Sequence, residues 1–467
     1  MSDVFVIEGG TIVTHDSTFR ADVVIRGEQI VSLTSDSSDI EGATRIDATG
    51  LLVLPGGIDA HTHFREPEEF TREGFFSGGQ GAAAGGITTV VEMPQADPTT
   101  VTVEQFQAKR TQVARTALVD MALWVGVVGG QLQSEFDLRN LASTGAVAFK
   151  SFLASSSPSF PAIDTTTLHW AMRIIAETGL PYALHAEDDN LLASGLHRLQ
   201  DRGRTDPLAH AESRPPLVES VAVAEALYLA EITGCWVHIC HCASADALRL
   251  VAEARARGVR VTVETCPQYL SLNTDDLVAL KGYGRCAPSL RDQDEVDQIW
   301  SYVMDETIDL ICSDHCGFTR EQKDAGAEDI FRAPLGLAGV QTLLPVFFDA
   351  AVNQRQMSLN QFVRQMATNP AQIFELYPRK GTIAVGSDAD LVIFDPDRTW
   401  VVLGEEMLHK QKWTPFEGKS VTGRVIRTIR RGEVIYDDSL EGEARLPGLA
   451  GSGRYLPRGY GQDGSSS

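Results

Sequence analysis

The stretch PGGIDAHTHFREPEEF, residues 55–70, places two histidines, His61 and His63, two positions apart directly after an apolar run with glycines. In a β-strand, residues i and i+2 point to the same face, so the two imidazoles can converge on one point. Two neutral imidazoles at one place suit a divalent metal ion of the zinc class. A His-x-His pair alone also fits a polar strand end, so its meaning depends on the rest of the chain.

Seven other segments share this form, an apolar run that finishes on polar residues. Helical segments lie between them, such as residues 218–234 and 245–258, where apolar residues recur at i, i+3 and i+4 and a glycine follows. Eight strand–helix units predict an α/β fold, a (β/α)8 TIM-type barrel with insertions. A doubly wound open sheet is the alternative, but the chain has neither a GxGxxG nor a P-loop sequence. The seven segments are GITTVVEMP (86–94), MALWVGVVG (121–129), AVAFKSFL (146–153), LPYALHAE (180–187), WVHICHCAS (236–244), VTVETCP (261–267) and IDLICSDH (308–315).

The two ends of the chain have a different pattern, short β-branched runs separated by glycines or polar turns. We therefore predict a small β-sandwich built from both termini, residues 1–54 and 380–440, which flanks a barrel of residues 55–379. Residues 441–467 are predicted to form a C-terminal tail. The runs are VFVIEGGTIVT (4–14), ADVVIRG (21–27), DADLVIFDPD (388–397) and GRVIRTIRRGEVIYDD (423–438).

The composition narrows the class of protein. The chain has 467 residues, 40 of them Lys or Arg and 63 Asp or Glu, for a formal net charge of -23. The basic residues are scattered, which argues against a nucleic-acid or anionic-membrane partner. No apolar stretch approaches 18 residues, and the first residues lack a leader pattern, so we expect a cytoplasmic protein. Of the seven cysteines, Cys240 and Cys242 share one strand-like run, and we expect reduced thiols.

Further metal-ligand candidates stand at the ends of other predicted strands. His185 ends the fifth, His241 the sixth and Asp314 the eighth. In a barrel the carboxyl ends of the strands surround one mouth, so these residues become neighbours of His61 and His63. On the sixth strand the sequence offers two histidines, and we choose His241 over His238 because its period-2 partners, Val237 and Ile239, are expected to face the barrel interior.

Lys150 is the single charge in the apolar fourth strand, GAVAFKSFLAS. A buried ammonium is unfavourable, and nearby metal cations would disfavour it further, so the neutral amine is favoured. A neutral amine can add carbon dioxide, and the resulting carbamate (N6-carboxylysine) has two oxygens that can bridge two metal ions. The alternative is a lysine whose ammonium reaches the solvent at the strand end.

A series of motifs resembles the cyclic amidohydrolases, the group of allantoinases, hydantoinases or dihydropyrimidinases, and dihydroorotases. The resemblance runs in order from about residue 5 to residue 440, and it implies a metal-bearing barrel with a flanking β-sandwich. The motifs are DAHTHFREP, GGITTVVEMP, VAFKSFL, LHAED, SRPPLVES, HICHCAS, ETCPQYL, RCAPSLRD, CSDH, MATNPAQIFEL and KGTIAVGSDADLVIFD.

The resemblance also implies a site with two divalent ions. By position, His61 and His63 hold one ion, which Asp314 also contacts, and His185 and His241 hold the other. Carbamylated Lys150 bridges the two ions. Zinc is favoured by the ligand types, and manganese, cobalt or iron fit the same ligands. The resemblance implies a homotetramer, and the alternative of a non-catalytic dihydropyrimidinase-related binding protein would be marked by lost ligands.

The chemistry implied is hydrolysis of the C–N bond of a cyclic amide. Two divalent ions lower the pKa of a shared water and polarise the ring carbonyl. Asp314 is the predicted catalytic residue, because a carboxylate beside that water can accept its proton and deliver it to the departing ring nitrogen.

The substrate ring is less clearly indicated. Arg65 matches the arginine that binds the substrate carboxylate in dihydroorotases, and otherwise it forms a rim salt bridge with Glu66 or Glu68. Three other dihydroorotase positions differ, where this chain has Gln95, Ala287 and Phe318.

Hydantoinases generally have a tyrosine where this chain has Ser155, and the resemblance to allantoinases is closer in FKSFL, SRPPLVES and GLAGVQTLLPVFFDAA. Gln95, Ser155 and Ser289 are candidates for hydrogen bonds to a ureido or imide group, or they are loop structure. Allantoin-like ureides are the first substrate prediction. An acidic cyclic amide or imide is the second, and dihydroorotase-like, hydantoinase-like or cyclic imide activity is the alternative.

Overall fold

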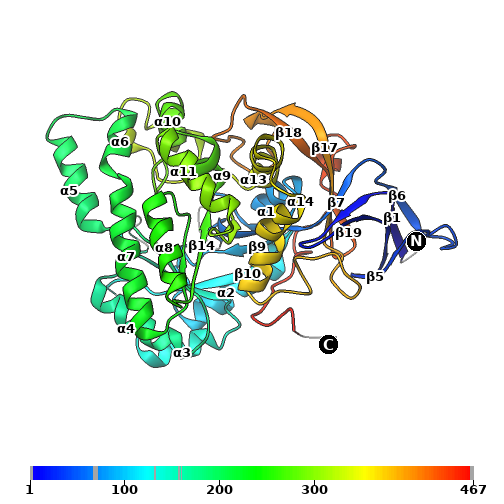
Figure 1. Cartoon of the computed structure of the whole chain (residues 1–467), viewed down its shortest axis with the longest axis horizontal. Coiled ribbons are helices and arrows are strands. Elements are labelled where there is room, and N and C mark those ends of the chain that lie inside the picture. The colour runs from blue at the N-terminus through cyan, green and yellow to red at the C-terminus, as the bar shows by residue number, and fades with distance from the viewer. Residues whose placement is uncertain (1–3, 67–71, 131–132, 156–157, 159, 463–467) are drawn as a thin grey trace.

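A computed structural model describes residues 4–66, 72–130, 133–155, 158 and 160–462 of the chain. A parallel sheet closes on itself and is surrounded by helices, which confirms the predicted (β/α)8 barrel (Figure 1). The first seven strands are β8 (Gly57–His63), β9 (Ile87–Glu92), β10 (Asp120–Gly126), β11 (Ala148–Phe152), β12 (Tyr182–His185), β13 (Val237–Ile239) and β14 (Val261–Thr265).

The eighth strand closes the barrel in two pieces. β15 (Leu310–Ile311) pairs with β14, and β16 (His315–Cys316) pairs in parallel with β8, the first strand. Residues 312–314 between the two pieces leave the ladder at the carboxyl end of the barrel. The break therefore lies where Asp314 is placed.

The helices follow the strands, and both helical segments singled out in the sequence are present as α7 and α8. Gly234 takes φ 72° and ends α7, and the Ser244 side chain accepts a hydrogen bond from the Ala247 amide and begins α8. The longer helices are α1 (Phe75–Ala84), α2 (Val103–Thr116), α3 (Glu135–Ala142), α4 (Thr165–Ala176), α5 (Asp189–Gln200), α7 (Pro216–Thr233), α8 (Ala245–Ala256) and α11 (Gln293–Met304). Shorter ones are α6 (Pro207–Ser213), α9 (Pro267–Ser271), α10 (Thr274–Leu280), α12 (Arg320–Asp324), α13 (Leu343–Phe348), α14 (Leu359–Val363) and α15 (Asn369–Ile373).

The two ends of the chain meet in a second unit of two packed sheets (Figure 1). A four-stranded sheet has the order β5-β4-β1-β6, and a six-stranded sheet has the order β19-β18-β17-β7-β2-β3. β7 pairs with β17, so residues 52–55 lie against residues 391–394. The strands are β1 (Val4–Glu8), β2 (Thr11–Val13), β3 (Thr18–Arg20), β4 (Asp22–Arg26), β5 (Gln29–Thr34), β6 (Thr44–Asp47), β7 (Leu52–Pro55), β17 (Leu391–Val401), β18 (Ser420–Arg430) and β19 (Glu433–Asp437).

One buried core joins the two sheets and includes Ile7, Val23, Val53, Leu391 and Ile429. These residues come from both termini, as the sequence predicts. The exact boundaries of the units, 54/55, 379/380 and 440/441, stay predictions.

Barrel strands bury side chains on both faces, and the two faces belong to different cores. On β11, Ala148 packs inside the barrel, whereas Phe149 packs outward against the helices. Lys150 has the parity of Ala148, so its side chain enters the barrel interior. Among the described residues, no helix has the length and apolarity required to cross a bilayer, and all seven cysteines are buried and free.

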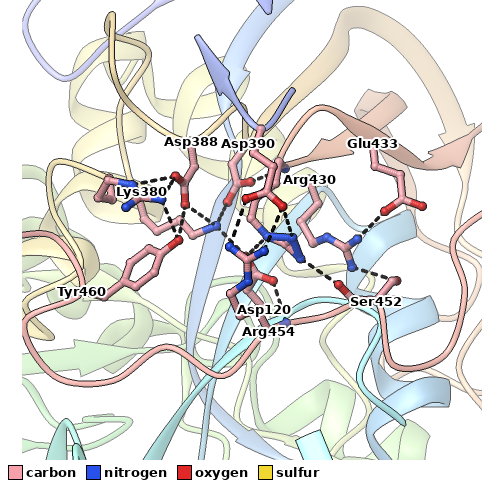
Figure 2. Close-up of polar contacts among 12 residues, drawn as sticks. Asp120, Lys380, Asp388, Asp390, Arg430, Glu433, Ser452, Arg454 and Tyr460 are labelled. Carbon is pink, nitrogen blue, oxygen red and sulfur yellow. Dashed lines mark hydrogen bonds and ion pairs between the residues drawn. The ribbon is translucent and has the colours of Figure 1, made fainter. Parts of the chain in front are cut away.

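A group of charged residues lies at the opposite end of the barrel, where β10 begins (Figure 2). We call Asp120, Lys380, Asp388, Asp390 and Arg431 the basal cluster. The Lys380 Nζ lies 2.6 Å from carboxylate oxygens of Asp120 and Asp390 and 3.2 Å from Asp388. The Arg431 Nε donates to Asp120 over 3.1 Å. Three carboxylates outweigh burial and raise the pKa of Lys380, so the cluster ties the first residue of β10 to the segment before β17.

Candidate functional site

A cavity of about 350 Å³ opens at the carboxyl ends of the barrel strands. This is the end at which barrel folds carry chemistry. Its wall combines histidines, arginines and one carboxylate with apolar residues. The lining residues are His63, Arg65, Arg72, Gln95, Phe152, Pro158, His185, His241, Arg285, Ala287, Asp314, Cys316, Phe318, Pro334, Leu335 and Gly336.

Three predicted ligands form one compact group at the floor of the cavity. The Asp314 Oδ1 lies 3.5 Å from His61 Nε2 and 3.3 Å from His63 Nε2. The ligand atoms of the three residues all lie within 4.8 Å of one another. Burial disfavours the charged carboxylate, but the His61 and His63 imidazoles lower the pKa of Asp314 below its ordinary value. Two nitrogens and an ionised oxygen are a donor set that suits a divalent transition metal.

The two remaining predicted histidines form a second group beside the first. His185 Nδ1 lies 3.0 Å from His241 Nε2, and the His241 ring centroid lies 5.2 Å from that of His61. The Nε2 of His185 faces Glu187 at 2.8 Å. Burial lowers the pKa values of His185 and His241, so both imidazoles are neutral, as metal ligation requires.

Lys150 has no exposed surface and is close enough to affect the pKa values of His61, His185 and His241. Its Nζ contacts the Cys240 Sγ at 2.8 Å and lies 5.1 Å from the centroid of the Phe152 ring. Among the described residues, no carboxylate is within ion-pairing distance of this amine. A buried ammonium without an anion is costly, and conversion to a carbamate would turn it into an anion that neighbouring cations stabilise.

Buried histidine nitrogens without hydrogen bonds are a second feature that fits a metal centre. The buried Nε2 of His61 and Nδ1 of His241 have no hydrogen-bond partner in the described structure. Buried polar atoms are normally hydrogen-bonded, so such atoms call for an ion or a water molecule. The six predicted residues, which we call the mouth cluster, are His61, His63, Lys150, His185, His241 and Asp314.

His241 belongs to the mouth cluster, but strand parity does not explain why. Val237 and Ile239 pack outward against the helices, and it is Trp236 and Cys240 that face the barrel interior. The parity argument was therefore wrong. β13 ends at Ile239, and His241 then adopts φ 34°, which turns its side chain toward the mouth.

The rejected histidine lies deeper in the barrel. His238 packs on Trp124 with ring centroids 6.2 Å apart, and its Nδ1 lies 2.8 Å from the Thr262 hydroxyl. Its Nε2 lies 3.2 Å from Glu264. It is a buried, hydrogen-bonded residue beneath the cavity.

Glu264 on β14 is a site residue that the sequence reasoning missed. Its carboxylate contacts His61 Nδ1 and His238 Nε2 and accepts a hydrogen bond from the His241 amide over 3.2 Å. Burial alone would lower the pKa of His61, but Glu264 and then Asp314 outweigh it and raise that pKa to about 10. A carboxylate on the far nitrogen orients a metal-binding imidazole. The signal was available, because Glu264 is a lone charge in the apolar run VTVETCP, as Lys150 is in its strand.

The four predicted substrate contacts fall into two pairs. Arg65 and Gln95 line the cavity, and the Arg65 guanidinium donates to Gln95 Oε1 over 3.0 Å. Ser155 is exposed, with its amide bonded to Asp189, and Ser289 is buried with an unpartnered hydroxyl. Neither serine is among the cavity-lining residues, and their role stays a prediction.

Arg65 forms no salt bridge with Glu66, one of the two partners that the sequence suggested. Glu66 instead accepts hydrogen bonds from the Phe75 amide, Gln112 and Thr116. Glu68 lies outside the described residues. Arg65 adopts φ 59° and its amide donates to Glu92, so the turn after β8 directs it across the cavity.

A second group of possible ligands, Glu73, His315 and His409, is buried behind Asp314. His315 Nδ1 accepts hydrogen bonds from the amides of Gly339 and Val340, so in the neutral ring the proton is on Nε2. That Nε2 faces Glu73 at 3.5 Å and cannot offer a lone pair to a metal. The facing atoms Glu73 Oε2, His315 Nε2 and His409 Nδ1 have no hydrogen-bond partner in the described structure, but with the proton on His315 Nε2 the group lacks a complete ligand set.

Comparisons with known proteins agree with this geometry. Residues 52–435 match a family described as "Amidohydrolase family". An allantoinase of Solibacter usitatus is 38% identical over 92% of this chain and 93% of its own. An L-hydantoinase of Paenarthrobacter aurescens is 34% identical over 93% of this chain and 94% of its own. The solved L-hydantoinase (dihydropyrimidinase) from Arthrobacter aurescens superposes with a TM-score of 0.92 at 32% identity, covering 98% of this chain and all of that one.

Proposed function

The chain belongs to the amidohydrolase family, and we propose that it is a binuclear metal-dependent hydrolase that opens the C–N bond of a cyclic amide or ureide. The observation that carries the proposal is the mouth cluster, in which five potential ligands from four strand ends surround a buried lysine without a carboxylate partner. A binding protein has no need of such a costly arrangement.

Each residue of the mouth cluster has a proposed role. His61, His63 and Asp314 would hold one ion, His185 and His241 the second, and Lys150, as N6-carboxylysine, would bridge them. When bound, two divalent ions acidify a water molecule and polarise the ring carbonyl. The low pKa of Asp314 keeps its carboxylate ionised, so it can take a proton from the water and pass it to the leaving ring nitrogen.

Allantoin is the first candidate substrate, because allantoinases are among the relatives that are 38% identical over most of the chain. Hydantoins and dihydropyrimidines are the second, since the solved neighbours carry those names. Dihydroorotate and cyclic imides complete the set, and Arg65, with Gln95 beside it, is the residue proposed to bind a substrate carboxylate or ureido oxygen.

Ring opening of these compounds by the purified, metal-loaded protein tests the proposal. We expect at least one of allantoin, hydantoin, dihydrouracil, dihydroorotate and succinimide to be opened, with loss of activity on chelation and recovery on adding metal. A protein that binds two metals per subunit but neither opens nor binds any of these rings would contradict it. Such a result would favour the dihydropyrimidinase-related binding protein.

Zinc as the native metal, a homotetrameric assembly and a cytoplasmic location are further parts of the proposal. The mixed nitrogen and oxygen donor set supports zinc, with manganese, cobalt or iron as substitutes. Elemental analysis of the protein as purified and sedimentation of the metal-loaded protein test the first two. A net charge of -23 supports a small molecule, not a nucleic acid or a membrane, as the partner.

A further inference from the structure

Two basic side chains on one wall of the cavity have no carboxylate within ion-pairing distance in the described structure. Lys323, on α12, has no exposed surface, and its Nζ donates to the carbonyl oxygens of Arg285, Pro334 and Gly336 over 3.1, 3.0 and 2.8 Å. All three carbonyls belong to residues that line the cavity. The Lys323 side chain therefore joins the segment after β14 to the segment after β16 from behind the wall, and its burial lowers its pKa to about 7.

Arg285 is the second basic residue, and it lines the cavity. Its Nη1 donates to the carbonyl oxygens of Phe331 and Ala333, the former over 2.8 Å, while its Nε has no partner. Burial, and then the Arg214 guanidinium, lower the pKa of Arg285 to about 10, so it remains charged at neutral pH. The Asp329 carboxylate opposes these effects only from beyond ion-pairing distance, so a largely buried guanidinium that bonds to neutral oxygens is incompletely compensated.

The close packing behind this wall depends on two glycines. A Cβ at Gly282 would collide with the carbonyl oxygen of Lys323, and a Cβ at Gly326 would lie 2.7 Å from the Ala333 Cβ. Gly336, at φ 139°, donates its amide to the Arg285 carbonyl over 3.1 Å. The wall is therefore a defined structure that holds Arg285 in place.

The charges around the cavity are unequal. Among its described lining residues, Asp314 is the single carboxylate, and it contacts His61 and His63. Arg285 and Arg65 both lack a carboxylate partner in the described structure. The chain as a whole carries -23, so a positive cavity is a local feature of an acidic protein. A pocket in which one sign of charge is in excess attracts ligands of the opposite sign.

We propose that the cavity accepts cyclic amides that carry a carboxylate, that Arg285 binds this carboxylate and leaves the ureido oxygen to Arg65, and that Lys323 is the positioning residue that holds Arg285. The inference rests on the proposed ring-opening function and narrows its substrate class. A guanidinium and a carboxylate form paired, charge-assisted hydrogen bonds, and the substrate would supply the anion that the wall lacks.

Matched rings test the first part of the proposal. Dihydrouracil and its 6-carboxylate differ only in the charged group, as do 5-methylhydantoin and hydantoin-5-acetate. We expect metal-loaded wild-type protein to favour the carboxylated member of at least one pair. Arg285→Gln should lower kcat/KM for that member at least ~30-fold and for the neutral member less than about 3-fold, because losing one partner of a desolvated charge pair has a large effect.

The outcomes separate this inference from the proposed function. Preference for the neutral ring, or an equal loss on both rings in Arg285→Gln, would overturn the inference and leave ring opening intact. If no ring is opened, the proposed function fails, and calorimetric binding still decides the inference. The carboxylated ring must then bind more tightly than its neutral counterpart to wild type, and Arg285→Gln must remove the difference.

Replacement of the buried Lys323 by methionine tests its positioning role. Lys323→Met should raise KM for the carboxylated ring about 10-fold, change kcat little, leave two metals bound, and speed amide hydrogen exchange in residues 331–336. Gln365→Met is the matched control, because Gln365 is also buried and binds two backbone carbonyls, of Val303 and Ile308, far from the cavity. It should lower stability without changing KM or exchange in residues 331–336.

Lys323→Gln serves if the methionine variant does not fold, since it retains two donor hydrogens. An unchanged KM and unchanged exchange in residues 331–336 in a folded Lys323 variant would refute the positioning role.

Discussion

Two buried lysines at opposite ends of the same barrel have opposite surroundings. In the basal cluster, Lys380 lies within 3.2 Å of three carboxylates. In the mouth cluster, Lys150 contacts a cysteine thiol and has no carboxylate partner among the described residues. Burial is equally complete, at 1% or less exposed surface for both.

The difference supports a structural role for the basal cluster and the proposed reactive role for the mouth cluster. Around Lys380 the charges are compensated and the donors have acceptors, so the cluster holds together the barrel and the segment before β17. The bond from Tyr460 to Asp388 adds the chain near its C-terminus (Figure 2). Around Lys150, buried nitrogens of His61 and His241 lack partners. Unsatisfied buried groups are costly, and they persist where a ligand completes them.

Removal of the mouth lysine should have the largest effect. Lys150→Ala eliminates the proposed bridging anion, so we expect loss of both metals and a fall in kcat of ~10³-fold or more. Metal content by elemental analysis and ring-opening rates check this, and short carboxylic acids should restore part of the activity. Full two-metal occupancy in this variant would contradict the role.

Removal of the basal lysine should affect stability and not chemistry. Lys380→Met removes the cation that three buried carboxylates share and leaves Asp390 without a side-chain cation among the described residues, so we expect the free energy of unfolding to fall by about 3–5 kcal/mol. Urea denaturation measures this. The folded fraction should retain wild-type metal content and KM, and a selective rise in KM would show that the two ends are coupled.

Glu264 lies below the proposed metal centre and contacts one of its proposed ligands. Glu264→Gln keeps the shape but weakens the acceptor for His61 Nδ1, so we expect metal affinity to fall 10- to 100-fold. Competition with a chromogenic chelator measures the affinity. His238→Gln, which changes the other partner of Glu264, should have a smaller effect, and equal effects would refute direct orientation of His61.

Arg65→Ala should leave the metal centre intact and weaken substrate binding. Arg65 lines the cavity and donates to Gln95, so we expect a rise in KM of about 10-fold with two metals still bound. Steady-state kinetics on the best ring of the panel measure this. An unchanged KM there would eliminate Arg65 as a substrate contact.

The two clusters should also differ in the pH range where each affects stability. Burial lowers the pKa of His63 from 6.5 to about 3, so below pH 6.5 the unfolded chain binds a proton that the metal-free folded chain does not. Stability should then fall with falling pH by up to about 1.4 kcal/mol per unit, and less in His63→Gln.

Lys380 has a raised pKa, so its contribution is fully present below its ordinary pKa of 10.5 and is lost as pH rises through the folded value. Lys380→Met should flatten this alkaline limb. Urea denaturation across pH, with chelator present, measures both limbs. Unchanged slopes in the variants would contradict the assignments.

Much of the fold was predictable because its signals are local. Each barrel strand is an apolar run of a few residues, and His61, Lys150, His185 and Asp314 lie at or near the ends of such runs. The closure of eight parallel strands then brings those ends together, whatever the intervening helices are. Glu264 carried a local signal too, a lone charge in an apolar strand.

The choice of His241 shows where local reasoning failed. Strand parity placed His241 at the mouth of the barrel, where the structure has it, but the reasoning was wrong. The strand ends at Ile239, and a positive φ at His241 reorients the side chain. Backbone conformation after a strand is set by surrounding contacts, such as the bond from the His241 amide to Glu264.

The sequence by itself determined the barrel, the sandwich made from both termini and the residues able to bind metal, since periodicity and residue chemistry are properties of short segments. Only the tertiary structure decided which charges are compensated. Lys380 meets Asp120 across 260 residues of chain, and Lys323 meets the carbonyl oxygen of Arg285 across 38. Burial and pairing depend on these long-range contacts, and they distinguish a lysine that carboxylates neutralise from one that has no carboxylate partner in the described structure.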